Sequence, residues 1–345
     1  MNHRPKALKG LFAVSMIASL MLAVAGCGSS DSNSDSTTAS SGSASGKEVV
    51  LLTCAASNPW CKTFNEEITK GVEAAGASVT TLENNFDTAV QTQQFNQAIA
   101  KDPDLILLEA TDSKSVVPSI LKAGQAGVPV INLDGRAEDA ANEGLASQVL
   151  ADNPLLGKYA AENVVDGLKK IGLDQGNVIA ITGTKASTIT EDRMAGFDEV
   201  MAQHPEYNVV AVEDGNWDPV QSGKVAQELF AKYRSQGGIQ AAYGMADYQA
   251  VPIIQAAKQA GIPVGVANDG LIVTGSNCTK AGIEAIRSGD MFGTATEDPV
   301  NQGKDTAKWA VKFLEGEDLP PVIKTPQAQV RAENVEDHAV DCSKS

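Results

Sequence analysis

The sequence predicts an α/β protein of two Rossmann-like lobes, each built on a parallel sheet that is covered by helices. Short apolar runs alternate with helically periodic stretches along most of the chain. Strands that alternate with helices form right-handed crossovers, and these produce parallel sheets. The segment "QAGVPVINLDG" (125–135) also returns as "QAGIPVGVANDG" (259–270), about half of the folded body later. A repeat at this separation indicates two similar lobes rather than a short-period solenoid.

The expected strands are short apolar runs, and four of the nine end in an aspartate. They lie at 48–52, 78–82, 104–110, 128–134, 177–183, 208–214, 239–245, 262–269 and 292–298. Ligands of open α/β sheets bind outside the carboxyl ends of the strands. Asp134 and Asp269 end the two copies of the repeated segment, so we expect both carboxylates to face one crevice.

The N-terminus has the pattern of an export signal. Three basic residues precede a 16-residue apolar run that is too short for an ordinary membrane-spanning helix. The run ends in "LAVAGC", which resembles a bacterial lipoprotein signal with residues 1–26 removed and Cys27 acylated. A plain secretory signal is the alternative. We therefore expect a protein outside the cytoplasm, attached to the membrane through the lipid on Cys27.

Residues 27–47 predict a flexible tether, because they are rich in Ser and Gly and have no large apolar side chain. The folded body then runs from 48 to about 340, long enough for two domains. Without the signal, 24 basic residues face 43 acidic ones, a net charge of −19. This charge argues against nucleic acid and anionic lipid as partners.

Four cysteines remain once Cys27 is acylated, and three pairings are open to them. The pairing of Cys54 with Cys61, and of Cys278 with Cys342, is preferred because the first two flank one short turn. Four free thiols are the alternative. No Cys-x-x-Cys motif is present and histidines are few, so neither a metal site nor a cofactor is expected.

Polar and aromatic side chains just past the predicted strand ends form the candidate binding site. Carboxylates, amides and guanidinium groups of this kind make paired hydrogen bonds to neighbouring hydroxyls, and two tryptophans could cover the faces of a sugar ring. The candidates are Ser57, Asn58, Trp60, Asp134, Arg136, Arg193, Trp217, Asp247, Asn268, Asp269 and Glu297. Each has a structural alternative, such as helix capping, turn formation or packing at the lobe edge.

The order of several segments resembles the type I solute-binding proteins of ribose/galactose ABC transporters. The segments are "SNPWCKTFNEEITKGVEAAG", "VPVINLDGR", "LADNPLLGKYAAE", "GTKASTITEDRMAGF", "GNWDPVQSGKVAQELF", "VANDG" and "TATEDPVNQGKDTA". The resemblance implies that Asn58, Trp60 and Trp217 hold the ring, and that Asp134, Arg136, Arg193 and Asp269 bind its hydroxyls. Glu297 stands where Gln is common, and Cys61 replaces a second aromatic residue. These departures disfavour ribose as the ligand, so another sugar, a deoxysugar or a polyol is expected.

The resemblance also implies the division of the folded body. The N-terminal lobe is expected at 48–150 plus 298–325, and the C-terminal lobe at 151–297 plus 326–340, with three strands joining them. The lobes would close on a monosaccharide or polyol, and an ABC permease would recognise the closed, monomeric protein.

A secreted receptor that presents a sugar-like signal to a membrane sensor is the alternative function. An enzyme is not expected, because Gly-x-Ser-x-Gly, His-Glu-x-x-His and phosphate-binding loop motifs are missing. A glycosidase-like carboxylate pair of Glu297 and Asp269 is the one catalytic arrangement considered.

Overall fold

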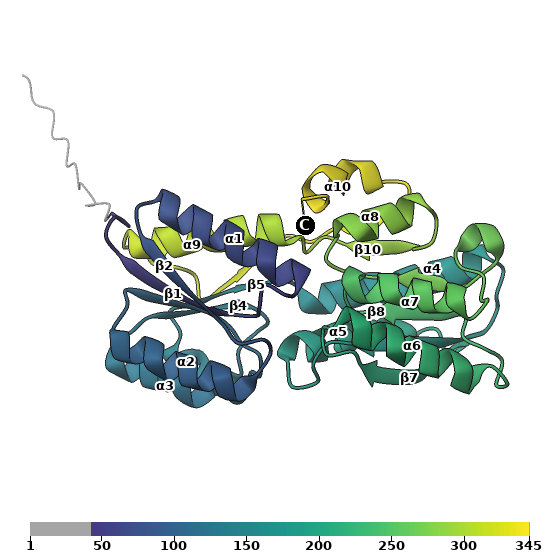
Figure 1. Ribbon diagram of the computed structural model, residues 1–345, viewed down its shortest axis with the longest axis horizontal. Coiled ribbons are helices and arrows are strands. Elements are labelled where there is room, and N and C mark those ends of the chain that lie inside the picture. The colour runs from purple at the N-terminus through teal and green to yellow at the C-terminus, as the bar shows by residue number, and fades with distance from the viewer. Residues whose placement is uncertain (1–42, 345) are drawn as a thin grey trace, which may run out of the picture. The chain divides into compact units, whose positions relative to one another are not determined.

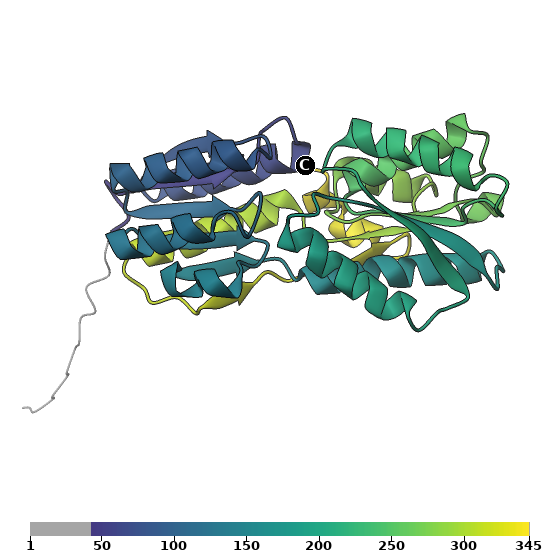
Figure 2. The ribbon, with the colours of Figure 1, turned by 90° about the horizontal axis from the view of Figure 1, so that it is seen from below.

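The computed structural model describes residues 43–344, which form two six-stranded sheets flanked by helices (Figures 1 and 2). The strand order is β11-β5-β4-β3-β1-β2 in the first sheet and β12-β10-β9-β8-β6-β7 in the second. Within the described residues, strands pair in parallel except β10 with β12. The predicted α/β fold is confirmed. The expected signal segment, Cys27 and residues 27–42 of the tether lie outside the described residues.

The first lobe places two pairs of helices on opposite faces of its sheet. Helices α1 and α9 cover one face, and α2 and α3 cover the other (Figure 1). The strands are β1 (Glu48–Thr53), β2 (Ser78–Glu83), β3 (Leu105–Glu109), β4 (Val130–Asp134), β5 (Ser147–Leu150) and β11 (Val322–Lys324). The helices are α1 (Pro59–Ala74), α2 (Thr88–Lys101), α3 (Val117–Ala126), α9 (Pro299–Leu314) and the 3₁₀ turn η1 (Asp139–Gly144).

The second lobe repeats this layered arrangement. Helices α4 and α5 pack on one face of its sheet, and α6, α7, α8 and α10 pack on the other. The strands are β6 (Gly176–Thr182), β7 (Tyr207–Asp214), β8 (Ala241–Gly244), β9 (Ile272–Thr274), β10 (Gly293–Ala295) and β12 (Gln329–Arg331). The helices are α4 (Asn153–Lys170), α5 (Thr188–Met201), α6 (Pro219–Tyr233), α7 (Asp247–Gln259), α8 (Lys280–Arg287), α10 (Val335–Cys342) and η2 (Val266–Asn268).

An Asx-Pro pair starts several of the helices that follow a strand. Asn58, Asp218 and Asp298 cap α1, α6 and α9 through their side-chain oxygens, and a proline follows each cap. The cap satisfies free backbone N–H groups, while proline has no N–H to lose at the first helical position. This local chemistry fixes where each helix begins, next to the carboxyl end of the preceding strand.

Three neighbouring segments carry the chain between the two sheets. They follow β5, follow β10, and join β11 to β12. The Ala328 backbone N–H donates to Thr296 Oγ1 at 2.7 Å, and the Asp152 N–H donates to Gln327 Oε1 at 2.9 Å. These bonds tie the three crossings to one another, as a hinge between lobes requires.

The last residues of the expected tether pack against the first lobe. Ala44 is buried, the Gly46 N–H donates to the Gly76 carbonyl at 2.9 Å, and Lys47 pairs with Asp104 at 2.8 Å. A boundary placed at 47 from composition alone is therefore a few residues late, because small side chains can also fill a shallow apolar surface.

The predicted strand at 262–269 is wrong, and the strand of this region is β9. After Pro263 the chain bends at Gly265, whose φ is +83°, and passes through η2 before β9 starts at Ile272. Only glycine fits there, since a Cβ on Gly265 would lie 2.0 Å from the carbonyl oxygen of Gly289. The extra residue of the second repeat thus changes a strand into a turn.

Both preferred disulfides are confirmed. Cys54 is bonded to Cys61 in the first lobe, and Cys278 is bonded to Cys342 in the second. Among the helices of residues 43–344, none combines the length and the apolar character that a membrane crossing needs.

Candidate functional site

A cavity of about 40 Å³ lies between the lobes at the carboxyl ends of both sheets. Side chains of the two lobes contribute to its wall, and most of them are buried. The lining residues are Cys54, Trp60, Cys61, Phe86, Glu109, Ala110, Thr111, Asp134, Ser187, Ile189, Arg193, Trp217, Tyr248, Asn277 and Glu297. The space exceeds the roughly 10–15 Å³ that one water needs, but a larger organic ligand would enter only with the lobes apart.

Trp60 brings the first turn of α1 to the cavity. Its ring is stacked on Phe64, with centroids 4.6 Å apart, and it is 5 % exposed. Its indole Nε1 donates to the backbone carbonyl of Glu297 at 2.9 Å, and Glu297 follows β10 of the other lobe. The indole is therefore both a wall of the cavity and a contact between the lobes.

Asp134 ends β4 and points its carboxylate into the same space. Its φ of +62° turns the chain away from the strand direction, a conformation that Asp tolerates better than most residues. Oδ1 accepts a hydrogen bond from Gln302 Nε2 at 2.9 Å, so α9 holds this carboxylate in place.

Arg193 is the cation of the cavity and is 1 % exposed on α5. Its Nε donates to Asn153 Oδ1 at 2.8 Å, and its terminal nitrogens donate to the Met245 carbonyl and to Glu297 Oε2. Arg193 reaches Asn153 because α4 and α5 lie very close together at Gly157. A Cβ on Gly157 would lie 1.8 Å from the Arg193 carbonyl oxygen, so only glycine allows this approach.

Trp217 stands on the side of the second lobe, in the turn after β7. Its φ is +56°, and its indole lies on the backbone of Gly183, where a Cβ would be 1.9 Å from the ring. The Arg193 guanidinium carbon lies 5.6 Å from the ring centroid, a cation–π distance. Contacts with both residues hold the indole in a strained turn at the cavity.

Glu297 connects the charged groups of the two lobes. One carboxylate oxygen accepts from Arg193 and from Asn277 Nδ2, the latter at 2.7 Å. Burial raises the pKa of Glu297 well above its usual value; Arg193 opposes the shift, and the Asp134 carboxylate adds to it. Asn277 follows β9 with a φ of +88°, and it occupies the strand-end position that the sequence analysis assigned to Asp269.

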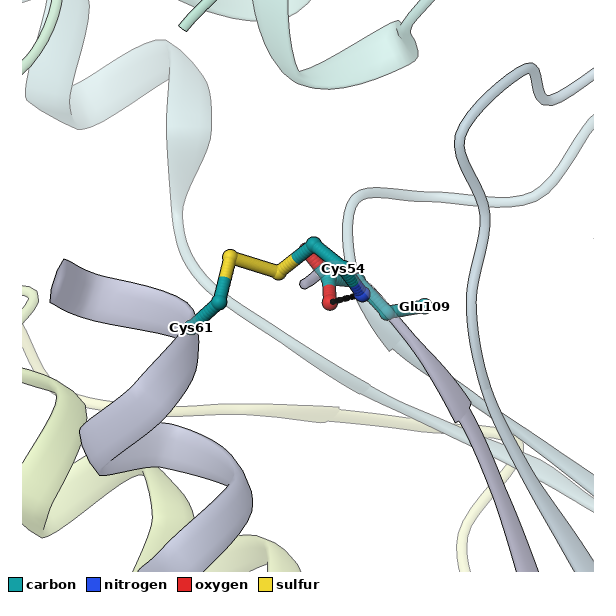
Figure 3. A group of neighbouring side chains, drawn as sticks. All are labelled: Cys54, Cys61 and Glu109. Atoms are coloured by element: carbon teal, nitrogen blue, oxygen red, sulfur yellow. Dashed lines mark hydrogen bonds between the residues drawn. A yellow bond between two sulfur atoms is a disulfide. The ribbon is translucent and has the colours of Figure 1, made fainter. Parts of the chain in front are cut away.

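Glu109, at the end of β3, is a buried carboxylate that the sequence analysis missed (Figure 3). It accepts from Thr53 Oγ1 at 2.7 Å and from the Cys54 N–H at 3.1 Å, beside the Cys54–Cys61 disulfide. Burial, and then Asp134, raise its pKa to about 7. The two sulfurs and the carboxylate are close enough for a metal, but bonded sulfurs offer no thiolate ligand.

The cavity has other members that escaped the sequence analysis, above all Tyr248. This residue follows Asp247 on α7, and burial raises the pKa of its hydroxyl. The signals were an acidic residue inside the apolar run "LILLEA" for Glu109 and the dipeptide "DY" for Tyr248. Neither motif singles out a binding residue by itself.

Six of the eleven candidate residues lie outside the cavity wall, Asn268 among them, and Asp269 is the clearest correction. It is exposed before β9, at the amino end of the sheet, because the strand starts later than predicted. Asp247 is buried but accepts from the Thr279 N–H at 2.7 Å and from Thr294 Oγ1 at 2.6 Å, which ties α7 to α8 and β10. It neither caps α7 nor reaches the cavity.

Arg136 lies at the rim and joins the lobes. Its Nε is 3.0 Å from both carboxylate oxygens of Asp192, and a terminal nitrogen is 3.0 Å from Glu191; both acids are on α5. The extra Gly135 shifts Arg136 away from the cavity that Asp134 faces.

Ser57 and Asn58 precede α1 but do not line the cavity. Ser57 is exposed, with its hydroxyl 3.5 Å from Asn85 Oδ1. Asn58 uses its Oδ1 to cap the helix and its Nδ2 to reach the Trp217 carbonyl at 3.4 Å. Trp60, Asp134, Arg193, Trp217 and Glu297 are thus the predicted residues that the fold brings together.

Two hinged α/β lobes form the wall of this cavity together. This arrangement is the defining feature of two-lobed binding proteins. Residues 49–318 match the periplasmic binding protein domain, and the chain belongs to this family, in its type I, ribose/galactose ABC branch.

The chain is similar to the ribose import binding protein of Haemophilus influenzae, with 26 % identity over 81 % of this chain and 90 % of that one. It is 28 % identical to the fructose import binding protein of Bifidobacterium longum, over 90 % of this chain and 91 % of that one. A solved galactofuranose binding protein matches at a TM-score of 0.78 and 18 % identity, over 85 % of this chain and 97 % of that one. These relatives are transport binding proteins, not enzymes.

Proposed function

We propose that the protein is the substrate-binding lipoprotein of an ABC importer and that it binds a monosaccharide or related polyol between its lobes. The observation that carries this proposal is the cavity wall, where Trp60 and Asp134 of one lobe meet Arg193, Trp217 and Glu297 of the other. Aromatic surfaces with polar groups around them suit a ring that has apolar C–H faces and hydroxyl edges. The import of simple sugars by relatives supports this choice.

Ligand capture would work by closure. The contacts from both lobes exist together only in the closed form, so a ligand that uses both walls shifts the population toward closure. The bonded crossing segments at Asp152, Thr296 and Ala328 would act as the hinge. A permease would recognise the closed monomer, and Cys27 would carry the lipid that keeps it outside the cytoplasm.

A thermal-shift screen of the purified protein tests the proposal against pentoses, hexoses, polyols, amino sugars, nucleosides and amino acids. A ligand at a hundredfold excess over its Kd adds about 2.7 kcal/mol to the free energy of unfolding. No stabilisation by any hydroxyl-rich compound, with clear stabilisation by an amino acid, would contradict the sugar assignment.

Two matched variants test the site. Asp134→Asn is expected to abolish the stabilisation, because this carboxylate lines the cavity. Asp269→Asn is expected to keep it, since Asp269 is exposed at the other end of its sheet. The opposite result would place the site elsewhere.

Presentation of the ligand to a membrane sensor is the second function that these residues allow. Deletion of the permease gene separates the two, because it abolishes uptake of an imported ligand and leaves a signalling response intact.

A further inference from the structure

The charged groups around the cavity are strongly unbalanced. Among its described lining residues, the carboxylates of Glu109, Asp134 and Glu297 stand against the single guanidinium of Arg193. All four side chains are buried. The guanidinium is already engaged, since Nε and both terminal nitrogens donate within the protein. Arg193 therefore neutralises Glu297 at most and leaves the two first-lobe carboxylates without a cation.

Hydrogen-bond donors and acceptors are unbalanced in the same direction. In the described part of the chain, Asn277 Oδ1 is a buried acceptor without a partner, and the Glu297 carboxyl faces the Asp134 carboxyl, another acceptor, at hydrogen-bonding distance. Two of the neighbouring donors are taken, because Asn277 Nδ2 bonds Glu297 and Trp60 Nε1 bonds the Glu297 carbonyl. Buried acceptors left unpaired are costly. A ligand that fills this space must therefore bring donors.

The carboxylates also repel one another across the cavity. Burial and the Asp134 charge hold the pKa of Glu109 near 7, and burial with the same neighbour raises the pKa of Glu297 against the pull of Arg193. Like charges gathered in a buried site retain protons unless a cation joins them. A cation inserted between the lobes would let these groups ionise together.

We propose, on the basis of the sugar-binding function above, that the ligand is an amino sugar or amino polyol whose protonated amine is held among Glu109, Asp134 and Glu297. An ammonium group supplies three donors and no acceptor, and it compensates the excess negative charge. The hydroxyls of the same ligand supply donors for the free Asn277 oxygen. A sugar phosphate or sugar acid would add a further anion to this wall and is excluded.

Matched sugar pairs test the proposal by isothermal titration of the purified protein at pH 7. The probes are D-glucosamine, D-galactosamine and D-mannosamine, each beside its neutral parent sugar and its N-acetyl derivative. We expect at least one amine to bind tenfold or more tightly than both of its neutral counterparts, as charge-assisted bonds in a buried site allow. Acetylation is the sharpest comparison, because it keeps the nitrogen and removes the charge.

Two other outcomes have distinct meanings. If a neutral sugar binds as tightly as the corresponding amino sugar, or more tightly, the proposal of a protonated amine is wrong. The proposed sugar-binding function is then unaffected. An absence of binding by every hydroxyl-bearing probe, in a protein that binds an amino acid, overturns both.

Glu109→Gln separates charge recognition from a structural role. Glutamine keeps an oxygen for Thr53 and the Cys54 N–H, so the variant removes the charge and little else. We expect the ratio of the amine affinity to the neutral-parent affinity to fall about tenfold or more. Equal loss of both affinities would overturn the proposal. Asp247→Asn, which neutralises a buried carboxylate outside the cavity, is the matched control and leaves the ratio of the two affinities unchanged.

Discussion

Arg136→Ala is expected to weaken ligand binding even though the side chain lies outside the cavity. Arg136 follows β4 of the first lobe, and its partners Asp192 and Glu191 are on α5 of the second. These ion pairs join the two lobes, so opening of the lobes would break them. Since ligand binding requires closure, their loss raises the Kd by the free energy that they contribute to the closed form.

The size of the effect follows from geometry and exposure. The Arg136 and Glu191 side chains are 38 % and 63 % exposed, so solvent screens this pair and it contributes little. The single Arg136 Nε–H is shared between both carboxylate oxygens of Asp192, and because that side chain is only 17 % exposed, this pair is less screened and contributes more. Together they contribute about 1–1.5 kcal/mol, or roughly a fivefold to tenfold rise in Kd. The effect stays modest because the Arg136 carbonyl keeps its bond from Thr188 Oγ1, at 2.6 Å.

Isothermal titration with the tightest-binding compound of the sugar panel measures the change, at low and at high salt. The loss should shrink at high salt, because salt screens partly exposed pairs. Lys158→Ala is the control, since Lys158 pairs with Glu199 within the second lobe at a similar exposure. Unchanged binding by Arg136→Ala, or an equal loss in the control, would refute a role of this ion pair in closure.

Three further results are expected. Replacement of Cys278 and Cys342 together by alanine lowers the free energy of unfolding by about 4 kcal/mol in a urea titration, because the disulfide spans 64 positions; a loss below 1 kcal/mol would contradict this. Glu109, with a pKa raised from 4.5 to about 7, binds a proton in the folded state that the unfolded state releases. The Tm should therefore fall between about pH 4.5 and 7, and Glu109→Gln should flatten that fall; an unchanged slope would count against the raised pKa. Gly157→Ala pushes α5 and its Arg193 away from α4, so both Tm and ligand affinity drop, and wild-type values for both would contradict the close packing.

The repeated segment and the alternation of strands with helices were enough to predict the two lobes. The prediction of two lobes is confirmed because strands made of uncharged apolar runs must be buried on both faces of a sheet, and helices provide that cover. The same pattern predicted the positions of Asp134 and Trp60, which follow strands whose ends were assigned correctly. Arg193 and Trp217 were candidates from the same strand-end pattern, and the family resemblance added their roles in the second lobe.

The rest of the site could not be predicted, because it depends on backbone geometry that the repeat conceals. One inserted residue and the left-handed turn at Gly265 moved the strand past Asp269, so Asn277 occupies the position expected for the aspartate. Glu109 was missed because an acidic residue in a strand is usually solvent-facing. Its inward position follows from the register of β3, buried between β1 and β4.

A fluorescence titration tests the central proposal, a sugar-like ligand enclosed between Trp60 and Trp217, most directly. The chain has three tryptophans, and Trp309 lies on α9 between two lysines, away from the cavity. In Trp309→Phe, only the two cavity indoles remain to report binding. We predict a saturable change of emission with one amino sugar or polyol of the panel, with the same Kd as the wild type. A signal that disappears with Trp309, or no saturable change with any hydroxyl-rich compound, would contradict the assignment of the site.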